Sequence, residues 1–445
     1  MQILNKTNEI AFFSLRTPQM RAFHLSWIAF FLSFFAWFGI APLMAIVRED
    51  LSLSKEQIGN TIIASVAITI FARLLIGPMC DRFGPRRVYA ALLTIGSIPV
   101  MGIGLADTYE AFLIARLAIG AIGASFVVTQ FHTSMMFAPN IIGTANATSA
   151  GWGNMGGGIT QMLMPLVLAG IVGLGVDQFL GWRLAMVVPG VLLFFMGIAY
   201  FLFTQDAPDG DFVDLRREED ASDVDSDKKS ALGSVAKDYR VWALFIIYAG
   251  CFGVELTINN IAALYYHDKF TLDFKTAGLI AGLFGLMNLF ARSMGGIFSD
   301  RLAKKFGLTG RVAMLGGALM LEGIALTVFS QMNQLGAAVA SMVVFALLVQ
   351  MASGATFSIV PFINQKAVGT VAGIVGAGGN VGAVAFGFLI RSPAIDFQTA
   401  LLYLGMVVIG ISLFATTVRF SPEAHAAERE AYRLAISGGT EAVAN

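Results

Sequence analysis

The sequence predicts an all-α membrane protein in which twelve transmembrane helices form two pseudo-symmetric six-helix bundles. Three observations support this prediction: an apolar composition, twelve long apolar runs, and motifs that recur in the two halves. Of the 445 residues, 56% are hydrophobic and 13% are charged, and the mean hydropathy is +0.73. About a quarter of an average soluble chain is charged, so this composition excludes an ordinary soluble domain.

The twelve apolar runs are each long enough to cross about 30 Å of hydrocarbon as a helix. They cover residues 22–47, 58–79, 88–106, 110–137, 143–172, 183–203, 240–265, 276–298, 310–330, 335–360, 369–392 and 398–418. The runs are separated by short loops, with a single long polar interruption after the sixth.

That interruption, residues 204–239, contains the acid-rich stretch DAPDGDFVDLRREEDASDVDSDKK. A segment so poor in apolar residues cannot form a core of its own. We therefore expect a cytoplasmic acidic linker here, between an N-terminal six-helix bundle (1–203) and a C-terminal six-helix bundle (240–420), with a cytoplasmic tail at 421–445.

The basic residues predict the orientation of the chain. With both termini in the cytoplasm, 20 Lys and Arg fall in inside segments and 6 in outside loops, as the positive-inside rule requires. The remaining three, Arg73, Arg116 and Arg292, lie within apolar runs. We expect a multi-pass protein of the inner (cytoplasmic) membrane, monomeric and surrounded by lipid. The formal net charge of zero gives no reason to expect a nucleic acid partner.

No pattern in the sequence indicates an enzyme. The two cysteines, Cys80 and Cys251, lie in or at the ends of apolar runs, and the four histidines are scattered. No metal-ligand spacing, nucleophile–base set or acid pair is present, so neither a metal nor a cofactor is expected.

The two halves carry matching motifs. FARLLIGPMCDR (71–82) and FARSMGGIFSDR (290–301) share one frame at an offset of 219 residues, and GWGNMGGG (151–158) matches GAGGNVGA (376–383). The second and fifth runs therefore correspond to the eighth and eleventh. Parallel repeats about an axis normal to the membrane are typical of secondary transporters, whose site lies at the repeat interface.

The repeat places one arginine of each half near mid-membrane. Arg73, Gly77 and Asp81 are four residues apart and share a helix face, and Arg73 lies about 12 Å above Asp81. Arg292 and Asp300 repeat this spacing. An Arg at this depth costs about 2.5–3.5 kcal/mol and usually marks a pathway. Two guanidinium groups at a shared cavity suit a small planar oxyanion, unless each is paired internally to tie helices together.

These residues resemble a known family. GPMCDRFGPRR (77–87) is similar to the loop signature of the major facilitator superfamily, and GGIFSDRLAKKFG (295–307) is similar to a weaker second copy. The glycine blocks around Asn154 and Asn380 resemble the two signatures of its nitrate/nitrite porter family. FGVELTINNI (252–261) is similar to the uptake-type branch of that family.

The resemblance implies a secondary active transporter that moves nitrate, and also nitrite, by alternating access, with proton-coupled uptake in nitrate assimilation. Obligate nitrate/nitrite antiport is an alternative within transport. An anion channel or a nitrate receptor without transport are the alternatives outside it.

The resemblance also implies the substrate-binding residues. Arg73 and Arg292 would clamp the anion, Phe126 and Phe252 would form an aromatic lid, and Tyr248 and Asn154 would donate to the anion. For Phe126 and Phe252, plain packing is the alternative, because the chain has 37 Phe.

Helical phase agrees with part of this set. Tyr248, Phe252, Glu255 and Asn259 follow the i, i+4, i+7, i+11 spacing of one helix face. Exposing the Asn380 side chain to lipid would be costly in free energy, as it would be for Asn154. We therefore expect Asn380 to make hydrogen bonds across helices or to the substrate.

Glu255 is the candidate for proton coupling. An empty site would hold two buried positive charges, which favours anion exchange, whereas a carboxyl that moves protonated with nitrate makes symport possible. The alternative is a structural carboxylate paired to an arginine. Glu322, in the ninth run, has no evident partner. Arg116 is expected to snorkel or to brace helices.

Conformational change is expected at the glycines and at two aspartates. Gly77, Gly156, Gly157, Gly296 and Gly382 let backbones approach and slide, or simply pack tightly. Asp81 and Asp300 are expected to latch one access state, by accepting from the N-terminus of a neighbouring helix or from arginines such as Arg82, Arg86 and Arg87. The alternative for these aspartates is a topology anchor.

Overall fold

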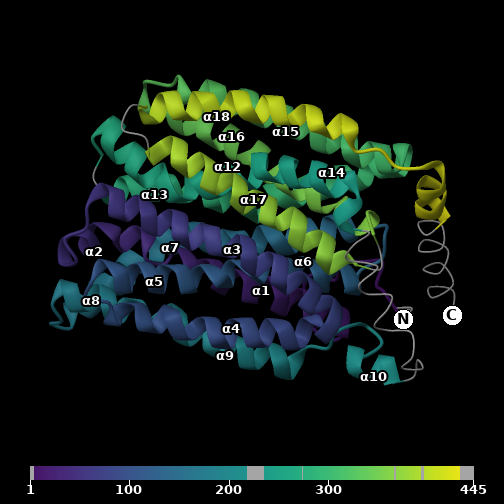
Figure 1. The fold of residues 1–445 in the computed structure, drawn as a ribbon, viewed down its shortest axis with the longest axis horizontal. Helices are drawn as coiled ribbons and strands as arrows, with labels where there is room; N and C mark the ends of the chain where they lie inside the picture. The colour runs from purple at the N-terminus through teal and green to yellow at the C-terminus, as the bar shows by residue number, and fades with distance from the viewer. Residues whose placement is uncertain (1–4, 218–234, 273, 365–366, 392–394, 431–445) are drawn as a thin grey trace.

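The computed structural model describes residues 5–217, 235–272, 274–364, 367–391 and 395–430. Within them, twelve helical segments are long and apolar enough to cross a membrane. They run in alternating directions, with the N-terminal half below the C-terminal half in Figure 1. The predicted fold class, an all-α membrane protein of two six-helix bundles, is confirmed.

The N-terminal bundle contains six spans, two of which are interrupted. They are α1 (Pro18–Phe38), α3 (Lys55–Phe83), α4 (Pro85–Gly102), α5 (Tyr109–Gly120) with α6 (Ser125–Met136), α7 (Ile142–Gly173), and α8 (Gln178–Ala185) with α9 (Val187–Phe203). A short α2 (Met44–Asp50) follows the first span.

The C-terminal bundle repeats this arrangement. Its spans are α12 (Tyr239–Phe270), α13 (Phe274–Leu286) with α14 (Ala291–Phe306), α15 (Leu308–Ser330), α16 (Leu335–Phe357), α17 (Val368–Arg391) and α18 (Phe397–Ser412). Residues 5–17 and 421–430 lie at one end of the bundles, which we call the termini end, and α2 and α8 lie at the opposite end (Figure 1).

Two spans that the sequence presents as continuous are broken by 3₁₀ turns. Ala121–Ala124 separates α5 from α6, and Met287–Leu289, followed by Phe290, separates α13 from α14. Each break comes shortly before a predicted site residue, Phe126 or Arg292. Breaks at this depth are tolerated where the freed backbone groups face protein or a cavity rather than lipid.

The outer surface is apolar, as a lipid-facing surface must be. Large apolar side chains that are more than half exposed occur on helices of both bundles, among them Phe71, Ile98, Phe195, Phe203 and Met406. In water such a surface would drive aggregation.

The predicted linker is only partly a solvated segment. Its first part packs on the N-terminal bundle through α10 (Phe212–Arg217), and Phe212 contacts Phe131 edge-on at 6.3 Å between ring centroids. The Asp206 carboxylate accepts from the amides of Arg86 (2.9 Å) and Phe212 (3.0 Å). Burial raises the pKa of Asp206 to about 6. Residues 218–234 of the linker and 431–445 of the tail lie outside the described residues.

The two bundles meet most extensively where α3 packs against α17 and where α7 packs against α13 and α14. These are the four spans that the sequence repeat relates. Glycines allow the backbones to touch: a Cβ at Gly77 would lie 2.5 Å from the carbonyl oxygen of Gly369, and one at Gly158 would lie 2.8 Å from the Cα of Gly285. A Cβ at Gly296 would collide with the backbone of Gly143.

A methyl group at Gly77 should therefore loosen the closed termini end. In Gly77→Ala, we expect faster hydrogen–deuterium exchange in residues 368–373, the first turns of α17, because the α3–α17 contact cannot form as closely. Gly317→Ala is the matched control, since no atom lies within 4 Å of a Cβ at Gly317. Equal exchange in both variants would contradict this account of the interface.

Candidate functional site

Two buried arginines, one from each bundle, flank a single aromatic ring. Arg73 on α3 and Arg292 on α14 are 0% and 1% exposed. The guanidinium carbon of Arg73 lies 5.0 Å from the ring centroid of Phe252, and that of Arg292 lies 5.7 Å from the same ring. The structure thus brings together the two arginines that the sequence repeat relates, at the centre of the bundle interface.

Stacked aromatic rings form the wall of this site. Phe126, Tyr248 and Phe252 lie nearly parallel, with centroid separations of 5.0–5.8 Å. Phe357 meets Phe126 and Tyr248 edge-on, at 4.6 and 5.0 Å. The Tyr248 hydroxyl is buried and has no hydrogen-bond partner among the described residues. Sequence reasoning missed Phe357, because one Phe near a helix end carries no distinguishing signal.

Arg73 makes hydrogen bonds but has no counter-charge. Its Nε donates to the carbonyl of Gly123 in the 3₁₀ break (3.1 Å), and its Nη1 donates to the carbonyl of Gly376 on α17 (2.6 Å). Its Nη2 has no hydrogen-bond partner in the part of the chain that the structure describes. Among the described residues, no carboxylate lies within ion-pair distance of Arg73. Carbonyl oxygens orient the guanidinium without neutralising it.

Arg292 is paired. Its Nη2 lies 2.6 Å from Glu255 Oε2, and Asn288 donates to the other oxygen of that carboxylate at 3.3 Å. The side chain of Asn154 contacts the same guanidinium, and its amide oxygen is the atom that can accept from Arg292.

The expectation of two uncompensated positive charges in the empty site is therefore wrong. With Glu255 ionised, the site carries one net positive charge, because the carboxylate on α12 reaches Arg292. The helical stripe from Tyr248 to Asn259 placed Glu255 on the correct face, but sequence spacing could not show the pairing across helices.

The remaining intramembrane polar residues mostly join helices. Asn380 donates to the carbonyl of Val66 on α3 at 3.2 Å, so it bonds across the bundles and no described contact links it to the arginines. Arg116 donates to the Trp37 carbonyl (3.1 Å) and to the Ser65 hydroxyl (3.2 Å). It braces α5 against α1 and α3.

The predicted mobile glycines act within bundles as well as between them. A Cβ at Gly156 would collide with the Phe31 carbonyl on α1, and one at Gly382 with the Ala249 carbonyl on α12. Gly157 faces the ring of Phe38. These three glycines allow close packing inside a bundle, whereas Gly77 and Gly296 lie at the interface between bundles.

At the termini end, each bundle caps a helix of the other. Asp81 on α3 accepts from the Thr370 amide (3.0 Å) and hydroxyl (2.7 Å) at the start of α17. Asp300 on α14 accepts from the Thr144 amide (2.7 Å) and hydroxyl (2.6 Å) at the start of α7. A carboxylate at a helix N-terminus satisfies free amides and the positive end of the helix dipole.

The arginine next to Asp300 is not one that the sequence suggested. Arg311 on α15 lies 2.5 Å from Asp300, whereas Arg86 pairs with Asp211 and Arg82 lies over the ring of Phe83. Arg311 is fully buried. Arg311 lies at the start of an apolar run, where basic residues that set the topology also lie. Nothing in the sequence therefore distinguished it.

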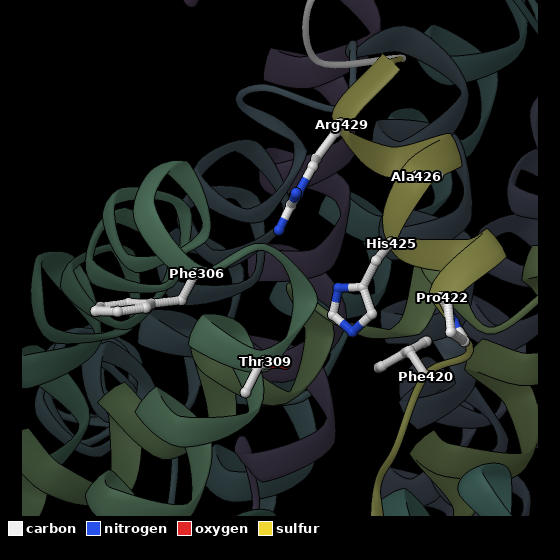
Figure 2. A pocket seen from close by; sticks show the side chains of 7 residues that line it. All are labelled: Phe306, Thr309, Phe420, Pro422, His425, Ala426 and Arg429. Carbon is white, nitrogen blue, oxygen red and sulfur yellow. The ribbon is translucent and has the colours of Figure 1, made fainter.

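The C-terminal segment adds a further contact to this cluster. Glu428 Oε1 lies 3.9 Å from Arg311 Nε, and residues 422–430 pack beside the start of α15. Between them is a cleft of about 470 Å³, which His425 and Arg429 line together with Phe306 and Thr309 (Figure 2). The cleft lies at the termini end, far along the helices from Arg73.

The sequence as a whole resembles known transporters. The pattern described as "Major Facilitator Superfamily" matches residues 26–387. "High affinity nitrate transporter 2.5" of Arabidopsis thaliana is 41% identical over 412 residues, covering 92% of this chain and 81% of the relative. "Nitrate/nitrite transporter NrtP" of a Picosynechococcus strain is 28% identical, covering 82% and 83%.

Solved structures give the same fold. A proton:xylose symporter superposes with a TM-score of 0.69 at 14% identity, covering 90% of this chain and 96% of that one. The human organic anion transporter MFSD10 gives a TM-score of 0.63 at 13% identity, with 90% and 100% coverage.

Removing both caps should open the termini end. In Asp81→Ala/Asp300→Ala, each lost cap costs about 1–2 kcal/mol, so the ratio of closed to open molecules should fall roughly 30-fold or more. The distance between spin labels at Arg87→Cys and Lys304→Cys, both exposed, should lengthen. Asp107→Ala at the opposite end is the control, and an unchanged distance in the double variant would rule out a latch.

Proposed function

This chain belongs to the nitrate/nitrite porter family of the major facilitator superfamily, and we propose that it carries nitrate across the membrane by alternating access between its two bundles. The termini end, which is rich in Lys and Arg, faces the cytoplasm in this proposal. Its relatives named for nitrate transport support the substrate, and those named for nitrate and nitrite support nitrite as a second one.

The observation that carries the proposal is the unpaired charge of Arg73. A buried guanidinium with two orienting carbonyls and a free Nη2 can bind an anion without first breaking an ion pair. The parallel rings of Phe126 and Phe252 lie over the Arg73 guanidinium, and their flat faces suit a planar anion. While Glu255 is ionised, one monovalent anion at Arg73 neutralises the one net positive charge of the site.

The positions of the contacts between the bundles support alternating access. The site sits between the bundles, and the caps at Asp81 and Asp300 close the termini end above it. Because each cap joins the two bundles, breaking both lets them rock apart around Arg73 and Arg292, as carriers built from repeats do. A channel would not need duplicated caps between its halves.

Glu255 supplies the proton coupling. While it is ionised it holds Arg292, and protonating it releases that guanidinium for a second set of hydrogen bonds to nitrate. A proton and nitrate therefore favour each other's binding, and by linkage the effect is reciprocal. Glu255 and nitrate compete for Arg292. Protonation of Glu255 therefore promotes nitrate binding directly, which favours proton-coupled uptake over exchange against nitrite.

Arg73→Lys should abolish nitrate uptake into proteoliposomes. A lysine keeps the charge but loses the planar set of donors, at a cost of roughly 2–4 kcal/mol or about 30- to 1,000-fold. Arg116→Lys is the matched control, because Arg116 is also buried and bonded to a carbonyl but is not near the aromatic rings. Wild-type uptake in Arg73→Lys would refute the proposed function.

Glu255→Gln should change how nitrate binding depends on pH. In the wild type, we expect nitrate affinity to rise as pH falls, because protonated Glu255 frees Arg292. The Gln variant should bind nitrate about tenfold more tightly near neutral pH and lose most of the pH dependence. Titration calorimetry over a pH series measures both effects. A wild-type pH profile in the variant would show that Glu255 only braces helices.

A further inference from the structure

A second buried carboxyl, Glu322, lies in the C-terminal bundle and has no role in the site described above. It is 0% exposed on α15, and neither of its oxygens has a hydrogen-bond partner among the described residues. An ionised carboxylate in an apolar helix bundle without a cation is very costly. Glu322 is therefore a neutral, proton-carrying acid in this conformation.

Glu322 lies at the depth of the anion site. It is 14 residues from the start of α15, and Arg292 is 14 residues from the end of α14. The two helices are antiparallel neighbours joined at Gly307, so both residues lie about 21 Å from the termini end. α15 packs against α14 and α12, the two helices that carry Arg292 and its partner Glu255.

Two buried polar side chains lie on the helix between the two carboxyls. Gln350 and Ser353 are one turn apart on α16, which packs against both α12 and α15. They lie near Glu255 and Cys251, but among the described residues neither the Gln350 amide nor the Ser353 hydroxyl makes a hydrogen bond of good geometry. Buried groups of this kind are uncommon unless they serve a function. Together with Glu322 they form a polar strip through an otherwise apolar bundle.

The charged groups around Glu322 are few. Glu255 and Cys251 lie on α12, which packs against α15, and Arg292, the partner of Glu255, lies on α14. Within the described stretches of α16 and α18, the only ionisable side chain is Tyr403, which is exposed. No cation other than Arg292 is therefore placed to compensate a charge on either carboxyl.

We propose that Glu322 is a second proton site of the carrier, which passes its proton to Glu255 when nitrate takes Arg292. The Glu322 O–H bond breaks as the Glu255 carboxylate gains that proton, and Glu322 then recovers a proton from solvent. Glu255 needs a proton at the moment it loses its arginine, and among the described buried acids Glu322 is the one that lies at the same depth. This inference rests on the proposed function.

Glu322→Gln tests the proposal, because glutamine keeps the size and neutrality of the acid but cannot release a proton. In proteoliposomes, nitrate accumulation driven by a pH gradient should fall at least tenfold, while nitrate/nitrate counterflow and nitrate affinity stay within about twofold of wild type. Glu428→Gln, at a buried carboxyl of the termini end, is the matched control. Glu322→Asp should restore part of the accumulation.

Infrared difference spectroscopy gives a readout that does not depend on transport. Nitrate binding should shift the carbonyl band of a protonated buried carboxyl in the wild type, and that band should be missing in Glu322→Gln. Normal accumulation in Glu322→Gln, or an equal loss of accumulation and counterflow, would overturn the proposal. So would wild-type counterflow with no response to a pH gradient. Absence of wild-type nitrate counterflow would instead overturn the proposed function.

Discussion

The ion pair between Arg292 and Glu255 determines the charge of the central site. Two buried guanidinium groups without counter-charges would repel each other, but this carboxylate neutralises one of them. Arg73 is left as the single uncompensated cation, held by carbonyls of Gly123 and Gly376. The site is thus matched in charge to one monovalent anion.

The duplication of the chain accounts for the placement of these groups, but the two halves have specialised. The shared Phe-Ala-Arg frame places Arg73 and Arg292 at one depth. The equivalent aspartates, Asp81 and Asp300, each cap a helix of the opposite bundle. Only the C-terminal half adds a carboxylate beside its arginine and a second acid, Glu322, behind it. In this account the N-terminal half holds the anion, and the C-terminal half handles the proton.

Local pattern in the sequence was enough to predict the spans, the repeat and the face of α12 that carries Tyr248, Phe252 and Glu255. These depend on hydrophobic runs and helical phase, which are local properties. The 3₁₀ breaks before Phe126 and Arg292 were missed because the apolar runs continue through them. The Arg311–Asp300 pair, the Phe357 contact and the packing of Asp206 depend on tertiary contacts, which no local pattern specifies.

The central claim is that one anion binds at Arg73 between the two bundles. A cryo-electron microscopy structure of the protein with nitrate tests it most directly. We expect density for one planar anion within hydrogen-bond distance of Arg73 Nη2 and the Tyr248 hydroxyl, beside the Phe126 and Phe252 rings. An anion bound elsewhere, with Arg73 still joined only to backbone carbonyls, would contradict the account.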